Sequence, residues 1–191
     1  MSSSTSSIRT CAATTTSRAS GSTPIGSSSR AKGPKRASSS LSLRVVRIRI
    51  IAVGKAKDRD LRSLLGDYYT RIGRYAKLEE IEIKDGKVAE VAERLARSIP
   101  DRSRVVALEV DGQSMSSRGL ATWLERAENQ SVQTVVFLIG GAYGLPPELS
   151  KKADLRLSLS AMTLPHRLAR LFLAEQIYRG FSILRGEPYD H

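Results

Sequence analysis

Hydrophobic and polar residues alternate with two different periods along the chain after residue 44. Short runs of β-branched and apolar residues, typical of strands, alternate with segments whose apolar residues recur every three or four positions, as in helices. The predicted strands are 44–54, 78–83, 104–110, 132–139 and 155–159, and the predicted helices are 58–75, 88–99, 117–127, 146–152 and 165–184. Strands separated by helices predict an α/β fold, with a mainly parallel sheet and helices on both faces.

The last predicted helix, 165–184, differs from the others because its apolar residues point in almost every direction. A helix that is apolar on most sides is buried on most sides. In a domain of this size, that pattern favours a second subunit covering the helix. His166 and Arg170 share one face at the helix start, four residues apart, and we expect this face to be exposed to a ligand.

The first 43 residues show neither period. Residues 1–40 contain 14 Ser and 6 Thr, and residues 1–43 contain six Lys or Arg and no acidic residue. So few large apolar groups predict disorder, and a Ser-rich, Arg-bearing, acid-free segment is typical of an organellar transit peptide. The excess of Ser and Thr over Arg favours a chloroplast over a mitochondrion. A basic arm that contacts RNA is the alternative, and the folded domain is expected at 44–191.

Composition excludes several classes of protein. The net charge is +12, but half of it belongs to residues 1–43, so the domain itself is only moderately basic. A single cysteine, Cys11, excludes a disulfide framework and a cysteine-based zinc site, and two histidines leave little for a metal centre, so no metal is expected. The longest apolar runs fall far short of the roughly 18 residues of a membrane helix, so no membrane association is expected.

Two segments at strand ends are candidates for binding chemistry. In 138–147 a buried strand runs into Gly140 and Gly141, at the sheet edge where α/β proteins bind ligands. A side chain at position 141 is expected to project into the ligand space, although a tight structural turn explains the glycines equally well. The spacing is not the G-x-G-x-x-G of dinucleotide binders.

The second segment, 158–166, joins the last strand to the last helix. Ser160 and Thr163 can cap that helix, and the amides of its first turn can bind polar ligand atoms. Met162 as a core residue and His166 as a capping or core-edge residue are the alternatives without function.

The motifs at 138–145, 159–166, 173–179 and 186–189 resemble the RlmH family. These are S-adenosylmethionine-dependent methyltransferases of the SPOUT superfamily that methylate N3 of a pseudouridine in large-subunit rRNA. The resemblance covers about 46–191. It implies a C-terminal trefoil knot, a homodimer, S-adenosylmethionine as cofactor and ribosomal RNA as partner.

The family pattern also implies which residues bind the methyl donor. Leu108 and Gly141 would line the pocket, and one continuous run would wrap the donor: Ser160, Ala161, Met162, Thr163, Leu164 and Pro165. One departure concerns the C-terminus. Family members commonly end Pro-Tyr-His plus one or two residues, whereas this chain ends Pro188-Tyr189-Asp190-His191, so any role of the tail histidine is in doubt or has moved to His191.

An imide nitrogen such as N3 of pseudouridine is a poor nucleophile until its proton leaves, so a general base would help. His166 is the candidate proton acceptor, and Arg170, Tyr189 and His191 are candidates for holding RNA. Two other functions stay open: methylation of another RNA such as tRNA, and RNA binding without catalysis in ribosome assembly.

Overall fold

The computed structural model describes residues 46–189, and the predicted transit peptide and His191 lie outside this range. The five strands are β1 (Arg47–Val53), β2 (Lys77–Ile83), β3 (Ser103–Ser114), β4 (Thr134–Ile139) and β5 (Leu155–Ser158). The five helices are α1 (Arg59–Ile72), α2 (Val88–Ser98), α3 (Ser117–Asn129), α4 (Pro147–Lys152) and α5 (His166–Arg185). Each of the ten predicted elements is present, most within three residues of its predicted ends.

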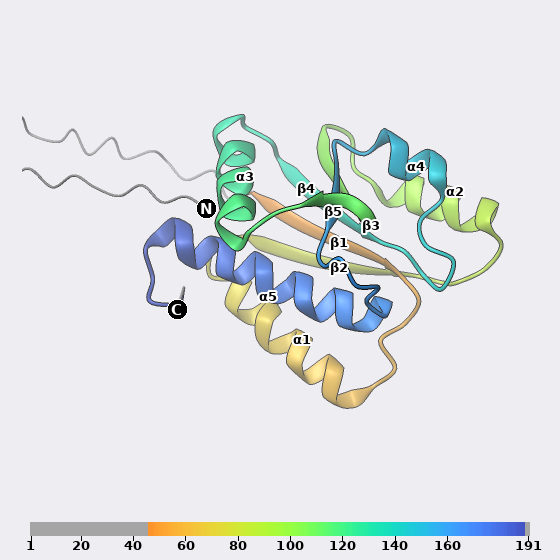
Figure 1. The fold of residues 1–191 in the computed structure, drawn as a ribbon, viewed down its shortest axis with the longest axis horizontal. Coiled ribbons are helices and arrows are strands. Elements are labelled where there is room, and N and C mark those ends of the chain that lie inside the picture. Colours follow the sequence, from red (N-terminus) through yellow and green to blue (C-terminus); the bar gives the residue numbers. More distant parts are fainter. Residues whose placement is uncertain (1–45, 190–191) are drawn as a thin grey trace, which may run out of the picture. The chain divides into compact units, whose positions relative to one another are not determined.

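The strands form one sheet in the order β2-β1-β4-β3-β5 (Figure 1). Every pair of neighbouring strands is parallel, which confirms the predicted sheet. All six residues of the central strand β4 are buried, as expected for a strand with a continuous apolar sequence and helices on both sides. The carboxyl ends of the strands therefore meet at one edge of the sheet.

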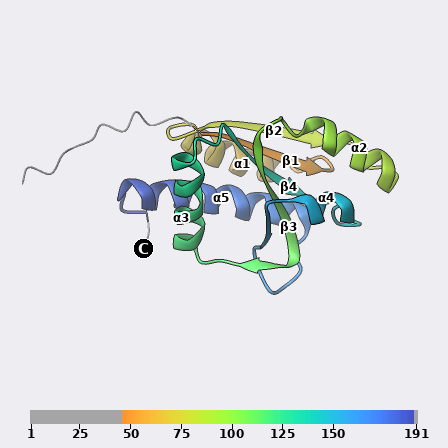
Figure 2. The same cartoon turned by 90° about the horizontal axis from the view of Figure 1, so that it is seen from above.

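Helices cover both faces of the sheet, as predicted (Figures 1 and 2). The larger core lies under α3 and α5, whose Leu124 and Phe181 are almost wholly buried with residues of β1 and β4. The smaller core lies on the other face, where Leu95 of α2 packs with Leu138. Each helix contributes one apolar stripe to these cores, which is what holds it on the sheet.

Strand β3 continues four residues beyond its predicted end because its register with β5 shifts. Leu157 of β5 is paired with both Leu108 and Gln113, so the intervening residues bulge out of the ladder. A Cβ on Gly112 would lie 2.7 Å from the main-chain carbonyl carbon of Leu157. Glycine is therefore required where the two strands approach so closely.

Helix α5 buries one face on α1, α3 and the sheet, and it is not covered on all sides within the chain. Leu168 is 52% exposed and Phe172 is 43% exposed. The helix ends at Gly186, whose φ of 66° is a left-handed conformation that suits glycine. The apolar side chains that predicted all-round burial thus include two that this single chain leaves open to solvent.

Candidate active site

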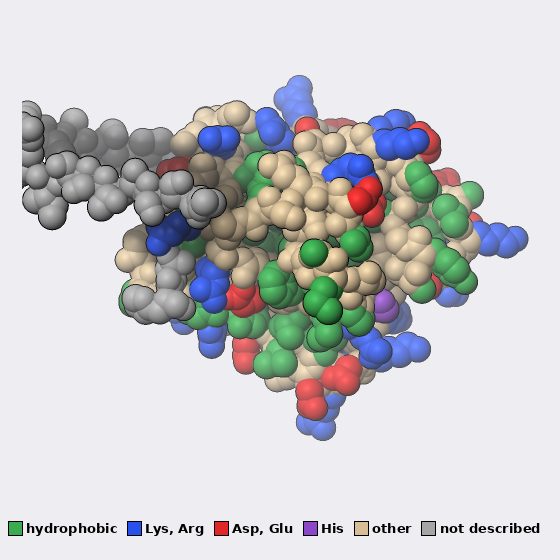
Figure 3. All heavy atoms as spheres, viewed as in Figure 1, with side chains coloured by type: hydrophobic (Ala, Val, Ile, Leu, Met, Phe, Trp, Pro, Cys, Tyr) green, Lys and Arg blue, Asp and Glu red, His purple; other side chains and the backbone are tan. Residues whose placement is uncertain are grey.

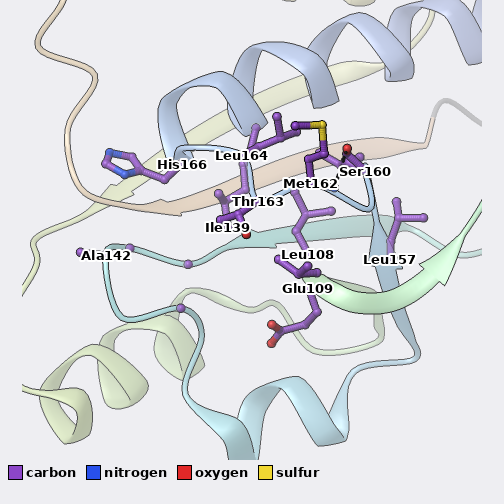
Figure 4. Close-up of a pocket in the computed structure, with 16 residues that line it drawn as sticks. Leu108, Glu109, Ile139, Ala142, Leu157, Ser160, Met162, Thr163, Leu164 and His166 are labelled. Carbon is purple, nitrogen blue, oxygen red and sulfur yellow. Dashed lines mark hydrogen bonds between the residues drawn. The ribbon is translucent and has the colours of Figure 1, made fainter.

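A cavity of about 220 Å³ lies at the carboxyl ends of β4 and β5, beside the middle of β3 (Figure 4). Three segments enclose it: residues 108–110 of β3, where the register shift begins, the glycine-rich loop after β4, and the loop between β5 and α5. The lining residues are Leu108, Glu109, Val110, Ile139, Gly140, Gly141, Ala142, Gly144, Leu157, Leu159, Ser160, Met162, Thr163, Leu164, His166 and Ala169. Both segments singled out from the sequence therefore meet at one site.

The glycine-rich loop is shaped by its own backbone. The Gly144 amide donates a hydrogen bond of 3.1 Å to the Gly141 carbonyl, and Gly144 has a φ of 77°. A Cβ on Gly140 would lie 2.4 Å from the carbonyl carbon of Gly144, an overlap with main chain that no rotamer relieves. Gly140 is therefore a requirement of the turn, and the turn forms one wall of the cavity.

The expected direction of a side chain at position 141 is wrong. A Cβ on Gly141 would lie 2.9 Å from Val53 Cγ1 and 3.7 Å from Asp85 Oδ1. It would thus point toward β1 and the loop after β2, and the backbone of Gly141, not a missing side chain, faces the cavity. Only the backbone contact implied by the family pattern fits this geometry.

The loop between β5 and α5 is held by two serines. The Ser160 hydroxyl accepts a 3.0 Å hydrogen bond from the Met162 amide, and the Ser158 hydroxyl lies 3.0 Å from the carbonyl oxygens of Val110 and Ser160. Neither Ser160 nor Thr163 caps α5, because Pro165 occupies the cap position without a side-chain hydrogen bond. Met162 is 77% exposed, so its interpretation as a core residue is wrong.

Six of the eight predicted donor-binding residues line the cavity: Leu108, Gly141, Ser160, Met162, Thr163 and Leu164. Ala161 and Pro165 lie in the same loop but are not part of the lining, and their contact with the donor stays a prediction. The sequence analysis missed Glu109 and Ala142, among others. Glu109 had a recognisable signal, since it is an acidic residue directly after the apolar run of β3.

His166 also lines the cavity, at the start of α5. Figure 4 shows its imidazole apart from the side chains of Leu108, Met162 and Leu164. Burial, followed by the positive charges of Arg170 and Arg167, lowers the pKa of His166, and the carboxylate of Asp85 opposes this shift. The imidazole is therefore neutral near pH 7 and able to accept a proton.

Arg170 does not lie where the sequence predicted it. Its side chain is wholly buried, and its guanidinium donates to Glu80, Glu82 and the Gly54 carbonyl. The face that Arg170 shares with His166 was expected to be exposed. A helical wheel shows only residues of the same helix, so it could not show that two carboxylates of β2 would pair with Arg170. Direct contact between Arg170 and RNA is therefore excluded in this conformation.

Tyr189, another predicted RNA contact, packs back on α5 and does not line the cavity. Its ring lies 4.6 Å from that of Tyr178 and 4.9 Å from the Arg179 guanidinium. Burial and the neighbouring Tyr68 raise the pKa of Tyr189 to about 12. The tail is thus ordered against the helix as far as Tyr189.

Residues 46–189 contain neither a metal-binding cluster nor a membrane-spanning helix. Within this range, no three His, Cys, Asp or Glu side chains are grouped so that they could hold a metal ion. No helix in the same range combines the length and the apolar character needed to cross a bilayer.

Comparisons with known proteins agree on one family. A family model described as predicted SPOUT methyltransferase matches residues 46–191. The chain is 49% identical over 146 residues to ribosomal RNA large subunit methyltransferase H of Sorangium cellulosum, covering 76% of this chain and 100% of that protein. It is 43% identical to the protein of the same name from Geobacter sp. strain M21, covering 76% of this chain and 99% of that one.

Among solved structures, the SpoU methyltransferase AviRb from Streptomyces viridochromogenes, in complex with AdoMet, overlaps this chain with a TM-score of 0.35 at 14% identity. The overlap covers 73% of this chain and 58% of that one, and the similarity is too low to support any conclusion. The family match and the close relatives suffice: the chain belongs to the SPOUT methyltransferase family, in its RlmH group.

Proposed function

We propose that this protein is an S-adenosylmethionine-dependent methyltransferase that acts on N3 of a pseudouridine in large-subunit ribosomal RNA. The observation that carries the proposal is the cavity, which brings the loops 138–147 and 158–166 together at the carboxyl edge of the sheet. Membership of the RlmH group supports the reaction, and the relatives' name supports ribosomal RNA as the substrate.

The residues around the cavity fit the chemistry of the methyl donor. Leu108, Ile139 and Leu164 offer apolar surface to an adenine ring and a methionine chain, and glycine backbone allows close approach. Glu109 supplies a carboxylate that can accept hydrogen bonds from ribose hydroxyls or an ammonium group. When bound, S-adenosylmethionine supplies an electrophilic methyl group on a sulfonium centre.

His166 is the group that removes the proton in this proposal. The neutral imidazole of His166 would accept the N3–H proton of the imide, so that N3 can bond to the methyl carbon that the donor would supply, with the donor's thioether as the leaving group. A histidine whose pKa is lowered, mainly by burial, is present in the accepting form at pH 7. Much of the remaining rate enhancement would come from orienting base and donor in line.

Exposed cations lie on the loops that follow β1 and β2 and next to His166 in the sequence. Lys55 and Lys57 follow β1, Lys84 and Lys87 follow β2, and Arg167 is next to His166, all of them exposed. Such a group suits phosphate contacts, which supply much of the affinity of proteins for RNA. The exposed Tyr143 on the glycine-rich loop can stack on an unpaired base.

The homodimer and the C-terminal knot belong to the same proposal. Hydrophobic side chains gather on the surface over α5 and the loop before it (Figure 3), where Met162, Leu168 and Phe172 are exposed. A second copy of the chain is the proposed partner for this surface. Dimer mass in light scattering for the wild type, and monomer mass for Leu168→Arg/Phe172→Arg, is the expected result; a wild-type monomer that methylates RNA would contradict it.

The proposal includes delivery to a chloroplast by residues 1–43, on the composition of that segment. A fluorescent protein fused to residues 1–50 is expected to enter plastids, and the same fusion starting at residue 44 is expected to stay in the cytosol. Import of the fusion into mitochondria would replace chloroplast by the alternative organelle, and a cytosolic signal would overturn the transit peptide.

The donor site is tested by the same substitution at two exposed threonines. Thr163 lines the cavity, whereas Thr122 lies on α3 and is not part of the lining. Thr163→Trp should fill the cavity and weaken S-adenosylmethionine binding by at least about tenfold in calorimetric titration. Thr122→Trp should leave the affinity unchanged. Equal affinity in both folded variants would show that the cavity is not the donor site.

The substrate is tested by methyl incorporation into ribosomes and tRNA, followed by mapping of the modified base. Label in large-subunit RNA, on N3 of a pseudouridine, is expected. Label in tRNA alone would favour the second methyltransferase hypothesis. A protein that binds RNA but neither binds S-adenosylmethionine in calorimetry nor labels either RNA would favour the non-catalytic assembly protein.

A further inference from the structure

A charge cluster centred on a buried arginine lies beside the cavity and plays no part in the reaction proposed above. Arg170, in the second turn of α5, is wholly buried. Its Nη1 donates to Glu80 Oε1 at 3.1 Å and to Glu82 Oε1 at 2.7 Å, and its Nη2 donates to the Gly54 carbonyl at 2.9 Å. We call Arg170, Glu80 and Glu82 the Arg170 cluster.

The two carboxylates come from alternate positions of β2 and therefore face the same side of the sheet. Burial raises the pKa of Glu82, but the Ala56 amide and the Arg170 guanidinium lower it more, so its pKa falls below the ordinary value. Glu82 is thus ionised. The pairing of a buried arginine with two carboxylates is costly to break, because the loss of one partner leaves an unpaired charge.

The cluster holds the loop after β1 at two points. Arg170 binds the Gly54 carbonyl, and Glu82 Oε1 accepts a 2.8 Å hydrogen bond from the Ala56 amide. Gly54 has a φ of 91°, and a Cβ built on it would lie 3.5 Å from His166 Nε2. The imidazole of His166 therefore packs against a stretch of backbone that Arg170 and Glu82 fix in place.

We infer that Arg170 is a positioning residue: its cluster holds the 54–56 loop as a wall against the imidazole of His166 and so fixes that ring at the rim of the cavity. One guanidinium joins α5, β2 and the loop after β1, and His166 belongs to the first of these and packs against the last. The importance of this placement for methyl transfer rests on the proposed function; the placement itself does not.

The charged groups that face His166 make the same arrangement electrically asymmetric. Arg167 and Arg170 of α5 oppose protonation of the imidazole, and Asp85, on the loop after β2, favours it. Removing the guanidinium of Arg170 removes one of the two opposing charges. The pKa of His166 should then rise, which gives a signal that can be measured without substrate.

The test is NMR spectroscopy of the imidazole in the full chain. The chain has only two histidines, so a His191→Gln spectrum assigns His166. In the wild type, a nuclear Overhauser effect between Gly54 Hα and the imidazole is expected. In Arg170→Met this effect should disappear, the His166 titration midpoint should rise by about half a pH unit or more, and amide exchange at Ala56 should accelerate by about tenfold or more.

Two further variants separate position from charge and from global stability. Arg170→Lys keeps the charge but lacks the planar fork, so it should lose the Gly54 contact with little change in midpoint. Arg49→Met removes another arginine–glutamate pair between β1 and β2, that with Glu79, and should change none of the three signals. If Arg170→Met fails to fold, the triple variant Arg170→Met/Glu80→Gln/Glu82→Gln removes all three charges together. The nuclear Overhauser effect between Gly54 and His166 should be lost in this variant too.

An unchanged Gly54–His166 contact in folded Arg170→Met, or in the triple variant, would overturn the inference. Methyl transfer by the wild type is measured separately. If Arg170→Met loses the Gly54–His166 contact but the wild type transfers no methyl group, the role of the Arg170 cluster stands and the proposed function is wrong. If Arg170→Met keeps the contact and the wild type transfers methyl groups normally, the proposed function stands and the inference about Arg170 is wrong.

Discussion

The loops at the carboxyl edge of the sheet form two sides that differ in their content of charged side chains. On the cavity side, the segments 140–146 and 159–165 contain no Lys, Arg, Asp or Glu at all. On the charged side, the loops 54–58 and 84–87 contain four Lys and two Asp, and the Arg170 cluster lies beneath them. His166 stands between the two, lining the cavity with its ring packed near Gly54.

The difference shows how the two sides can be disturbed separately. Backbone approach shapes the two loops on the cavity side, so an added methyl group is a severe change there, and these loops carry no charged side chain that a substitution could remove. Ion pairs and exposed cations shape the charged side, where a neutral side chain of equal size is the informative change. The predictions below use this contrast.

The largest effect is expected for Gly140→Ala on the cavity side. Its Cβ would lie 2.4 Å from the Gly144 carbonyl carbon and 2.7 Å from the Leu145 nitrogen. Because neither atom can rotate away, the turn must open, at a cost of about 3 kcal/mol or more in the free energy of unfolding. Donor affinity, measured by calorimetry on the folded fraction, should fall by about a hundredfold or more.

Gly144→Ala is the matched control in the same turn. Nothing lies within 4 Å of a Cβ at this position, although its φ of 77° disfavours a side chain. Strain alone should cost about 1–2 kcal/mol and leave donor affinity within about twofold. If both alanines weaken binding equally, backbone overlap is not what shapes the cavity wall.

The second prediction concerns His166→Gln, at the boundary between the two sides. Methyl transfer under single-turnover conditions should slow by about a hundredfold, the usual range for a lost general base, which is about 2.7 kcal/mol in activation free energy. Donor affinity should not change, because the imidazole lies apart from the apolar group of lining residues.

The pH dependence gives this prediction a sign. A base with a lowered pKa is deprotonated down to a lower pH. Methyl transfer by the wild type should therefore be maximal above that pKa and fall as the pH drops through it. The midpoint should lie below the ordinary histidine value of about 6.5. In His166→Gln this acid limb should vanish; an acid limb of the same midpoint in the variant would assign the titration to another group.

The sequence predicted the sheet well because its strands and helices differ in period. The central strand β4 is a continuous apolar run and is buried throughout, and Asp58 caps α1 by accepting from the Leu61 amide, close to its predicted start. The end of β3 was missed because the register shift at Leu108 and Gln113 depends on how closely β5 approaches Gly112, which no period encodes.

The sequence predicted the two loops that form the site but not the directions in which their side chains point. Glycine at 141 indicated a close approach, yet whether the missing side chain faced the cavity or Val53 depends on the turn made by Gly140 and Gly144. Arg170 was misplaced for a similar reason. Its partners Glu80 and Glu82 lie 90 and 88 residues away in the chain, beyond the reach of any helical wheel.

A smaller effect is expected where the two sides touch, at Gly141 and Val53. Gly141→Ala should weaken donor binding by about tenfold, or 1.4 kcal/mol, because its Cβ would lie 2.9 Å from Val53 Cγ1 and push the loop away from β1. Val53→Ala removes that atom. The double variant should recover about 1 kcal/mol of the loss in a double-mutant cycle; strictly additive effects would show that Val53 does not set the loop position.

The smallest effect is expected for Lys84→Gln/Lys87→Gln on the charged side. Both lysines are exposed on the loop after β2, so their removal should cost only phosphate attraction. The slope of log affinity for ribosomal RNA against log salt should fall by about 1 to 2, while donor affinity stays the same. Arg74→Gln/Lys77→Gln removes two exposed cations where the chain enters β2, at the opposite edge of the sheet, and should leave the slope unchanged. Equal losses in the two pairs would mean that RNA responds to the net charge of the domain, and that the charged side is not where it binds.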